Sequence, residues 1–195
     1  MLVGVLQKDA DLAPLRDKGF DAQNLTGVIA LCDTADEKFD SRQQAMAAQL
    51  TQTNELNRLF DKAVKQYADF RETARTVLSD EGPLKALKVS DAVPDALENF
   101  LTDARSAYTT AKKKAYVTAL GKKGYDAAAL DEQLAALEAL READEEQARL
   151  TGDAKKATTE RRQAVAPIQK FRSDVRRVAR RVFRKQPEQL AKLDF

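Results

Sequence analysis

Apolar side chains recur every seven residues through much of the first half of the chain. One line of this heptad pattern is Leu25, Cys32, Phe39, Met46, Thr53, Phe60, Tyr67 and Ala74, and its partner line is Val28, Ala35, Arg42, Gln49, Leu56, Ala63, Phe70 and Val77. A repeat of this kind is typical of helices that pack along a common seam. The phase continues through polar residues 49–54, where a hairpin loop would break it. The pattern therefore favours one long helix over about residues 21–79, with a helical hairpin as the alternative.

The second half of the chain follows a similar plan, less regularly. Its heptad line is Ala154, Ala157, Ala164, Ile168, Phe171, Val175, Val178 and Val182. A stripe closer to ordinary helical spacing precedes it, at Leu130, Leu134, Leu137 and Leu140. These stripes predict a long helix or a hairpin over about residues 126–185. A turn at Gly152 would give the hairpin, and Pro167 should at least kink a helix.

Three shorter segments complete the predicted elements. An apolar stripe after Pro94 predicts a helix over about residues 94–121, since proline is favoured at the first helical position. We expect residues 80–93 to form a linker and residues 187–193 to form a short terminal helix.

Two stretches of sequence repeat one another, Leu12–Leu25 and Val117–Leu130, and six of the 14 paired positions are identical. Gly19 suits the left-handed residue that ends a helix, and Phe20 would then contact Leu15 across that end. Asp21 can cap the next helix. The same structural roles in the second stretch fall on Leu120, Gly124, Tyr125 and Asp126.

The repeated corner indicates a tandem duplication of a helical unit. The two repeat halves would span residues 1–89 and 90–195, packed together as one domain. Helix-forming residues dominate the composition, which contains seven glycines and five prolines. We therefore predict an all-α fold, an elongated antiparallel helical bundle with coiled-coil-like heptad seams and no β-sheet.

The composition excludes much catalytic chemistry. The chain has no histidine, so it cannot build a Ser-His-Asp or Cys-His nucleophile or a histidine-ligated zinc site. Cys32 is the single cysteine, so no internal disulfide can form. The acidic side chains of Asp36, Glu37 and Asp40 could bind a hard cation, but on a helix such groups usually form a solvated face. We predict a protein that is not an enzyme, with no catalytic, cofactor-binding or metal-binding residues and no cofactor or small-molecule substrate.

Charge is segregated along the second half. Residues 126–153 carry nine acidic and two basic side chains, whereas residues 154–185 carry twelve basic and two acidic ones. Three explanations stay open: compensation within the chain, an antiparallel second copy, and binding of a polyanion. The third would use a solvent-facing ridge, which gives the candidate interaction surface Lys170, Arg176, Arg177, Arg180 and Arg184.

The expected function is a non-enzymatic helical scaffold or a protein–protein interaction and assembly protein. The alternative is binding of nucleic acid or another polyanion through the basic segment 154–185. A protein partner or self-association is the leading expectation for partners. No apolar run approaches the roughly 18 residues that a membrane span needs, and the expectation is a soluble cytoplasmic protein.

The segment that leads into the second corner starts at Asn99 and ends with Lys123-Gly124-Tyr125-Asp126, and an Ala- and Gln-rich stretch follows it. This arrangement resembles a group of uncharacterised bacterial helical proteins. In that group a helix ends in a Gly-aromatic turn, a long helix follows, and a proline-containing tail closes the unit. The first repeat half departs from this plan because its leading helix is shorter. The resemblance implies an all-helical fold and no active site.

Overall fold

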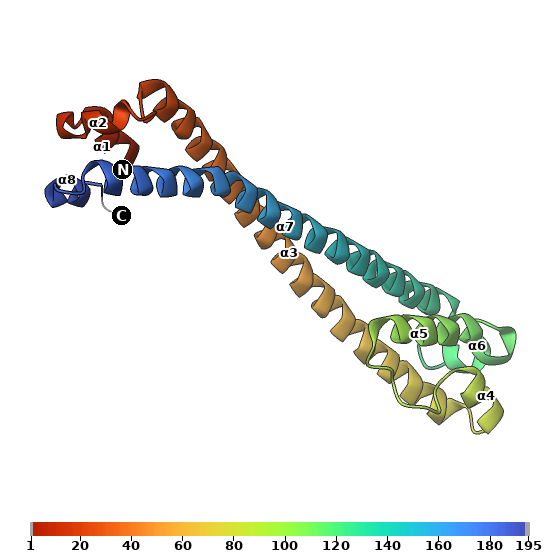
Figure 1. Ribbon diagram of the computed structural model, residues 1–195. Coiled ribbons are helices and arrows are strands. Elements are labelled where there is room, and N and C mark those ends of the chain that lie inside the picture. The colour runs from red at the N-terminus through yellow and green to blue at the C-terminus, as the bar shows by residue number, and fades with distance from the viewer. Residues whose placement is uncertain (1, 194–195) are drawn as a thin grey trace. The chain divides into compact units, whose positions relative to one another are not determined.

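The structure is a computed structural model that describes residues 2–193, and every regular element within that range is a helix (Figure 1). The elements are α1 (Leu2–Lys8), the 3₁₀-helix η1 (Ala10–Leu12), α2 (Ala13–Arg16), α3 (Ala22–Val77), α4 (Glu81–Ala86), α5 (Leu97–Ala111), α6 (Lys114–Gly121), α7 (Ala127–Val182) and α8 (Pro187–Ala191). The all-α fold class is confirmed. The short terminal helix is also present, as α8.

Both long segments are single helices of 56 residues, so the hairpin alternatives are wrong. In α3 the polar stretch at residues 49–54 stays helical because it contains neither glycine nor proline. In α7 both Gly152 and Pro167 lie inside the helix. Proline lacks a backbone N–H and removes one hydrogen bond, a loss that the flanking helix formers tolerate here.

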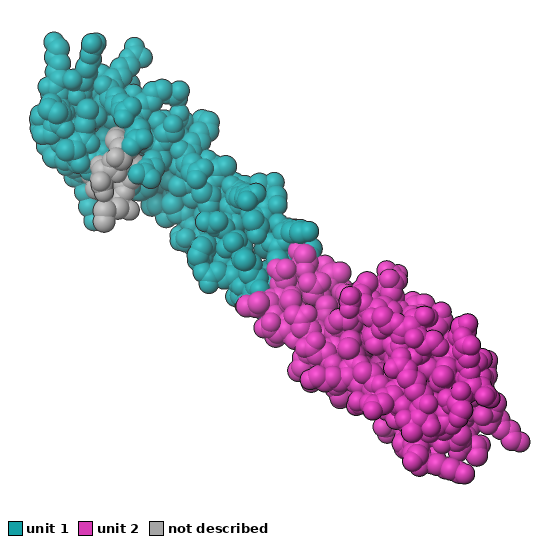
Figure 2. All heavy atoms as spheres, turned by 90° about the horizontal axis from the view of Figure 1, so that it is seen from below, with its two compact units in different colours: residues 1–47, 152–195 teal, residues 48–151 magenta. Residues whose placement is uncertain are grey.

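The chain forms two compact units (Figure 2). Unit 1 joins Met1–Ala47 to Gly152–Phe195, and unit 2 is Ala48–Thr151. Each unit contains a segment of α3 and a segment of α7, and therefore combines parts of both repeat halves. The boundary between the units is thus different from the boundary between the sequence repeats.

The core of unit 2 is built around aromatic side chains that α3 and α5 contribute. Tyr67 and Phe70 of α3 and Phe100 and Tyr108 of α5 are each at most 1% exposed. The Phe70 and Tyr108 rings meet edge to face with centroids 5.0 Å apart, and Tyr67 meets Phe100 in the same way at 5.7 Å. Such pairs add stability beyond their burial. Buried leucines complete this core, from α6 (Leu120) and α7 (Leu130, Leu137, Leu140).

In unit 1 the short N-terminal helices pack on the C-terminal part of α7. Leu6, Leu12 and Leu15 are fully buried. They share a core with the α7 residues Val175, Ala179 and Phe183. The ring of Phe20 meets Phe171 of α7 edge to face at 5.7 Å, so an aromatic contact also joins the corner before α3 to α7.

Both predicted corners are present. Gly19 and Gly124 each have a φ of 92°. At the first corner, Phe20 N–H donates to the Leu15 carbonyl (3.3 Å) and Gly19 N–H donates to the Arg16 carbonyl (3.2 Å). These two bonds define a Schellman helix end. The Asp21 carboxylate then accepts the Asn24 N–H at 2.9 Å, as expected of an N-cap.

The second corner repeats this geometry. Tyr125 N–H donates to the Leu120 carbonyl (3.1 Å), Gly124 N–H donates to the Gly121 carbonyl (3.1 Å), and Asp126 accepts from the Ala129 N–H (2.9 Å). The equivalence of the two corners is structural. The tandem duplication itself stays a prediction.

The predicted helix over residues 94–121 is wrong in two respects. It begins at Leu97 rather than Pro94, because Ala96 has an extended backbone. It also breaks after Ala111, and Lys113 is extended before α6 begins. Residues 112–114 are all lysine and contribute no apolar side chain to the core. A break in the helix there therefore costs little buried apolar surface.

The expected linker at residues 80–93 contains a helix, α4, which the sequence pattern did not predict. This helix ends in a third corner of the same kind. Val89 N–H donates to the Leu84 carbonyl and Lys88 N–H donates to the Lys85 carbonyl, both at 3.1 Å. Lys88 occupies the position that glycine takes at the other corners, with a φ of 55°.

Candidate functional site

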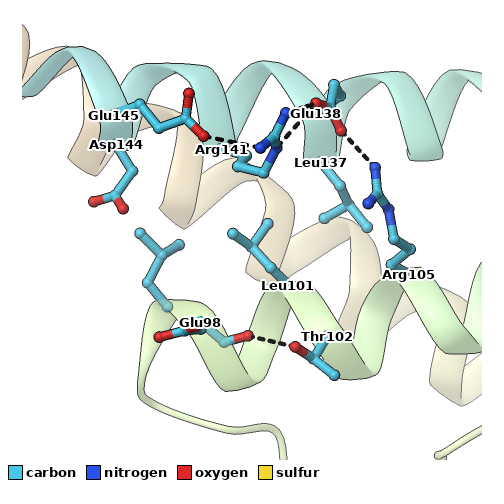
Figure 3. Close-up of a pocket in the computed structure, with 10 residues that line it drawn as sticks. Glu98, Leu101, Thr102, Arg105, Leu137, Glu138, Arg141, Asp144 and Glu145 are labelled. Atoms are coloured by element: carbon cyan, nitrogen blue, oxygen red, sulfur yellow. Dashed lines mark hydrogen bonds and ion pairs between the residues drawn. The ribbon is translucent and has the colours of Figure 1, made fainter.

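A groove in unit 2 lies between α5 and α7 (Figure 3). Its volume is about 530 Å³. Leucines form its apolar part: Leu97 and Leu101 from α5, and Leu137 from α7. These leucines belong to the apolar stripes of the two helices. The stripe of α5 faces α7 and the stripe of α7 faces α5, so the leucines meet in the groove. The groove therefore offers apolar surface bordered by charged groups.

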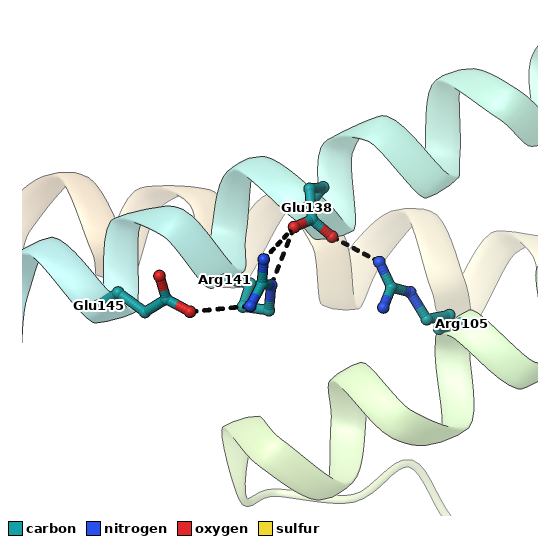
Figure 4. A network of polar contacts seen from close by, with 4 residues as sticks. All are labelled: Arg105, Glu138, Arg141 and Glu145. Carbon is teal, nitrogen blue, oxygen red and sulfur yellow. Dashed lines mark hydrogen bonds and ion pairs between the residues drawn. The ribbon is translucent and has the colours of Figure 1, made fainter.

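A chain of ion pairs crosses one edge of this groove (Figure 4). Glu138 of α7 accepts hydrogen bonds from Arg105 of α5 and from Arg141 one turn further along α7. Arg141 also donates to Glu145 at 2.8 Å. The Arg141 guanidinium lowers the pKa of the Glu138 carboxyl below its ordinary value. These side chains are 34 to 63% exposed, so the pairs orient the groove edge and add little stability.

Two carboxylates and the hydroxyl that line the groove are already engaged. Glu138 and Glu145 are engaged by arginines, and the Thr102 hydroxyl donates to the Glu98 carbonyl of its own helix at 2.9 Å. Across residues 2–193, no group of three or more His, Cys, Asp or Glu side chains is placed to hold a metal ion. The groove offers apolar contact from its leucines and charge recognition from its arginines and carboxylates.

A buried arginine of α3 forms hydrogen bonds with the segment that follows α4. Arg71 is 3% exposed and lies 5.5 Å from the centroid of the Tyr67 ring. Its guanidinium donates to the carbonyls of Val89 (3.2 Å) and Asp91. Backbone carbonyls carry partial negative charge, so these contacts hold a cation inside the protein. The sequence alone does not indicate this role, because an arginine on a helix gives no sign of which carbonyl it will reach.

All five predicted interaction residues lie on one exposed side of α7 in unit 1. They are Lys170, Arg176, Arg177, Arg180 and Arg184. Two of them flank Asp174, which accepts from Lys170 at 3.0 Å and pairs with Arg177. The Lys170 ammonium lowers the pKa of Asp174. The other side of the helix is buried, and Val175 and Ala179 there are 0% exposed.

We name the eight exposed cations of residues 170–185 the basic ridge. Its members are Lys170, Arg172, Arg176, Arg177, Arg180, Arg181, Arg184 and Lys185. Three of them, Arg172, Arg181 and Lys185, are additional to the predicted surface. The sequence could have identified these three residues, because every cation outside the apolar stripe of this helix is expected to be exposed.

The acidic part of α7 faces a different environment. Its carboxylates pair with cations of unit 2: Asp131 with Lys112, Glu138 with Arg105, and Glu146 with Arg149. Charge compensation within the chain could have come from a hairpin in which the acidic segment packs against the basic one. Because α7 is a single helix, its acidic and basic parts cannot pair in this way. Their order along the helix is the one the helix dipole favours.

The chain was compared with protein-family models, with curated proteins and with solved structures, and nothing matches. Of the helices that residues 2–193 form, none combines the length and the apolar character that crossing a membrane requires.

Proposed function

We propose that the protein is a non-enzymatic helical assembly protein that binds a second copy of itself through α3. The observation that carries the proposal is an apolar stretch of α3 in unit 1 that stays open to solvent. Phe39 is 40% exposed and Met46 is 44% exposed, although Leu25, Tyr67 and Ala74 of the same heptad line are fully buried in the cores. Exposed apolar patches on folded proteins often mark interaction surfaces.

The geometry explains why these side chains stay open. Phe39 and Met46 are seven residues apart and so share one face of α3. From α7, Arg161 covers one side of the Phe39 ring at 5.5 Å. One neighbouring helix buries part of such a face, and a further helix would bury the rest.

A second copy suits this face for two reasons. A two-fold antiparallel pairing of α3 with itself would set Phe39 of one copy against Met46 of the other, so the face is complementary to itself. Residues 43–47 carry no charge, so the carboxylate of Asp40 would meet no like charge there. Apolar contact would then be gained with little desolvation of ions.

Sedimentation velocity over a range of protein concentrations tests the proposal. The full chain is expected to sediment as a dimer, and Met46→Glu is expected to weaken the dimer at least tenfold by placing a charge in the contact, a cost of about 1.4 kcal/mol or more. Ala30→Glu is the matched control, because exposed Ala30 lies on the opposite side of α3 and the variant gains the same charge. A monomer at every concentration, or equal dimerisation of both variants, would contradict the proposal.

A further inference from the structure

The basic ridge of α7 is the most concentrated charge in unit 1. Its eight cations and the single anion Asp174 lie within residues 170–185, which gives a net charge of +7. At 1.5 Å per residue these 16 residues span about 24 Å. The helix then rises about 3.4 Å per unit of net positive charge, close to the spacing of phosphates along each strand of a DNA duplex.

Little within unit 1 neutralises this charge. The α3 segment of the same unit, residues 22–47, carries four acidic and two basic side chains. Asp174 pairs with two members of the ridge, whereas Arg180 and Arg184 have no ion pair within residues 2–193. A polyanion would therefore meet exposed cations, among them Arg180 and Arg184 without an ion pair within the described residues.

We infer that the basic ridge binds the phosphate backbone of duplex nucleic acid without reading its sequence. This goes beyond the proposed self-association, since it uses a different surface and a different class of partner. Arginine suits the task because its planar guanidinium forms paired hydrogen bonds with phosphate.

The structure disfavours an anionic membrane as the partner. A helix that lies in a membrane surface inserts its apolar side among the lipid chains. Here the apolar side of α7 is occupied by the core of unit 1, where Val175, Ala179 and Phe183 are at most 1% exposed. The ridge thus has charge to offer but no free apolar side to insert.

A single strand and a second copy of the chain also fit less well. Proteins that bind single strands stack bases on aromatic rings. Of the two aromatic residues within residues 170–185, Phe183 is 1% exposed and the Phe171 ring packs against Phe20. The acidic part of α7 would be the natural counterpart in a second copy. Several of its carboxylates are already paired with cations of their own unit, as Asp131 and Glu138 are.

Fluorescence anisotropy with a labelled DNA duplex of about 24 base pairs tests the inference at salt concentrations from about 50 to about 200 mM. The full chain is expected to bind at low salt, and the affinity should fall steeply as salt rises. A four-fold variant, Arg172→Gln with Arg180→Gln, Arg181→Gln and Arg184→Gln, removes four potential phosphate contacts. Its affinity at low salt should fall at least about 100-fold, and its salt slope should shrink by roughly 3 to 4 units.

Two further variants separate position from net charge. The same four positions changed to lysine should keep most of the affinity. The matched control removes four exposed cations from unit 2, as Lys62→Gln with Lys65→Gln, Lys113→Gln and Lys123→Gln, and should bind nearly as well as the parent. Circular dichroism and thermal unfolding verify that every variant is folded.

The same measurements define the outcomes that overturn the inference. No binding at about 50 mM salt would do so, as would equal losses in the ridge variant and the unit 2 control. An RNA duplex should bind within a few fold of DNA, because both present a phosphate backbone. Binding to anionic lipid vesicles but not to duplexes would assign the ridge to membranes, and strong preference for single strands would also refute duplex binding.

Discussion

Replacing Lys88 with glycine should stabilise unit 2, because Lys88 ends α4 in a left-handed conformation. Its φ of 55° lies in the region that glycine adopts freely and other residues avoid. The Lys88 carbonyl accepts a hydrogen bond from the Tyr67 hydroxyl at 3.1 Å, and the Val89 N–H closes the corner behind it. Both are backbone groups, so a glycine can preserve them.

The magnitude follows from three contributions. A residue with a Cβ loses about 1–2 kcal/mol in the left-handed region. Relief of this strain is the gain expected from glycine. Glycine also raises the conformational entropy of the unfolded chain, which lowers stability by about 0.4–1 kcal/mol. The Lys88 ammonium lies 3.8 Å from the Asp103 carboxylate, and a surface pair of this kind is worth a few tenths of a kcal/mol. We expect a net gain of about 0.5 kcal/mol in the free energy of unfolding.

Urea unfolding followed by circular dichroism measures the effect. Lys85→Gly is the matched control, because it removes a lysine from a helical position in the last turn of the same helix and should destabilise by up to about 1 kcal/mol. Gly124→Ala should also destabilise, by about 1 kcal/mol, since it places a Cβ at a φ of 92°. A loss of stability in Lys88→Gly as large as that in Lys85→Gly would refute the reasoning.

Two other perturbations follow from the long helix and from the aromatic core. Pro167→Ala should raise the free energy of unfolding by about 2 kcal/mol, because it restores a helix hydrogen bond at an exposed position; an unchanged urea midpoint would contradict this. Burial raises the pKa of Tyr108, and it raises that of Tyr67 to about 12. The unfolded chain therefore loses these protons first, near pH 10, and stability should fall as the pH rises further. Tyr108→Phe should make that fall shallower in urea titrations from pH 8 to 11, and an equally steep fall in this variant would contradict the reasoning.

Features that depend on neighbouring residues were predictable from the sequence. The corners at Gly19 and Gly124 close through hydrogen bonds that span three to five residues, so their chemistry is visible in a short stretch. The long helices were predictable because a heptad phase persists only along a continuous helix. The exposure of the basic ridge was also predictable, since the buried stripe of α7 leaves the charged positions on its other side.

Other features depended on contacts between segments that are distant in the chain. The groove edge requires Arg105 to reach Glu138, 33 residues away, and the buried position of Arg71 depends on carbonyls near residue 90. The corner at Lys88 is a local feature that the sequence hides, because glycine is the usual signal for it and packing holds a lysine there instead.

The sequence by itself determined that the chain is all-α, where its long helices run and where two of its corners lie. Helix propensity, heptad spacing and helix-end chemistry act over a few residues and leave a readable pattern. Tertiary structure alone decided that each compact unit combines segments of α3 and α7 and that Phe39 and Met46 stay exposed. The burial of a heptad position depends on how many helices surround it. The periodicity of a single helix shows which face packs but not how many helices pack against that face.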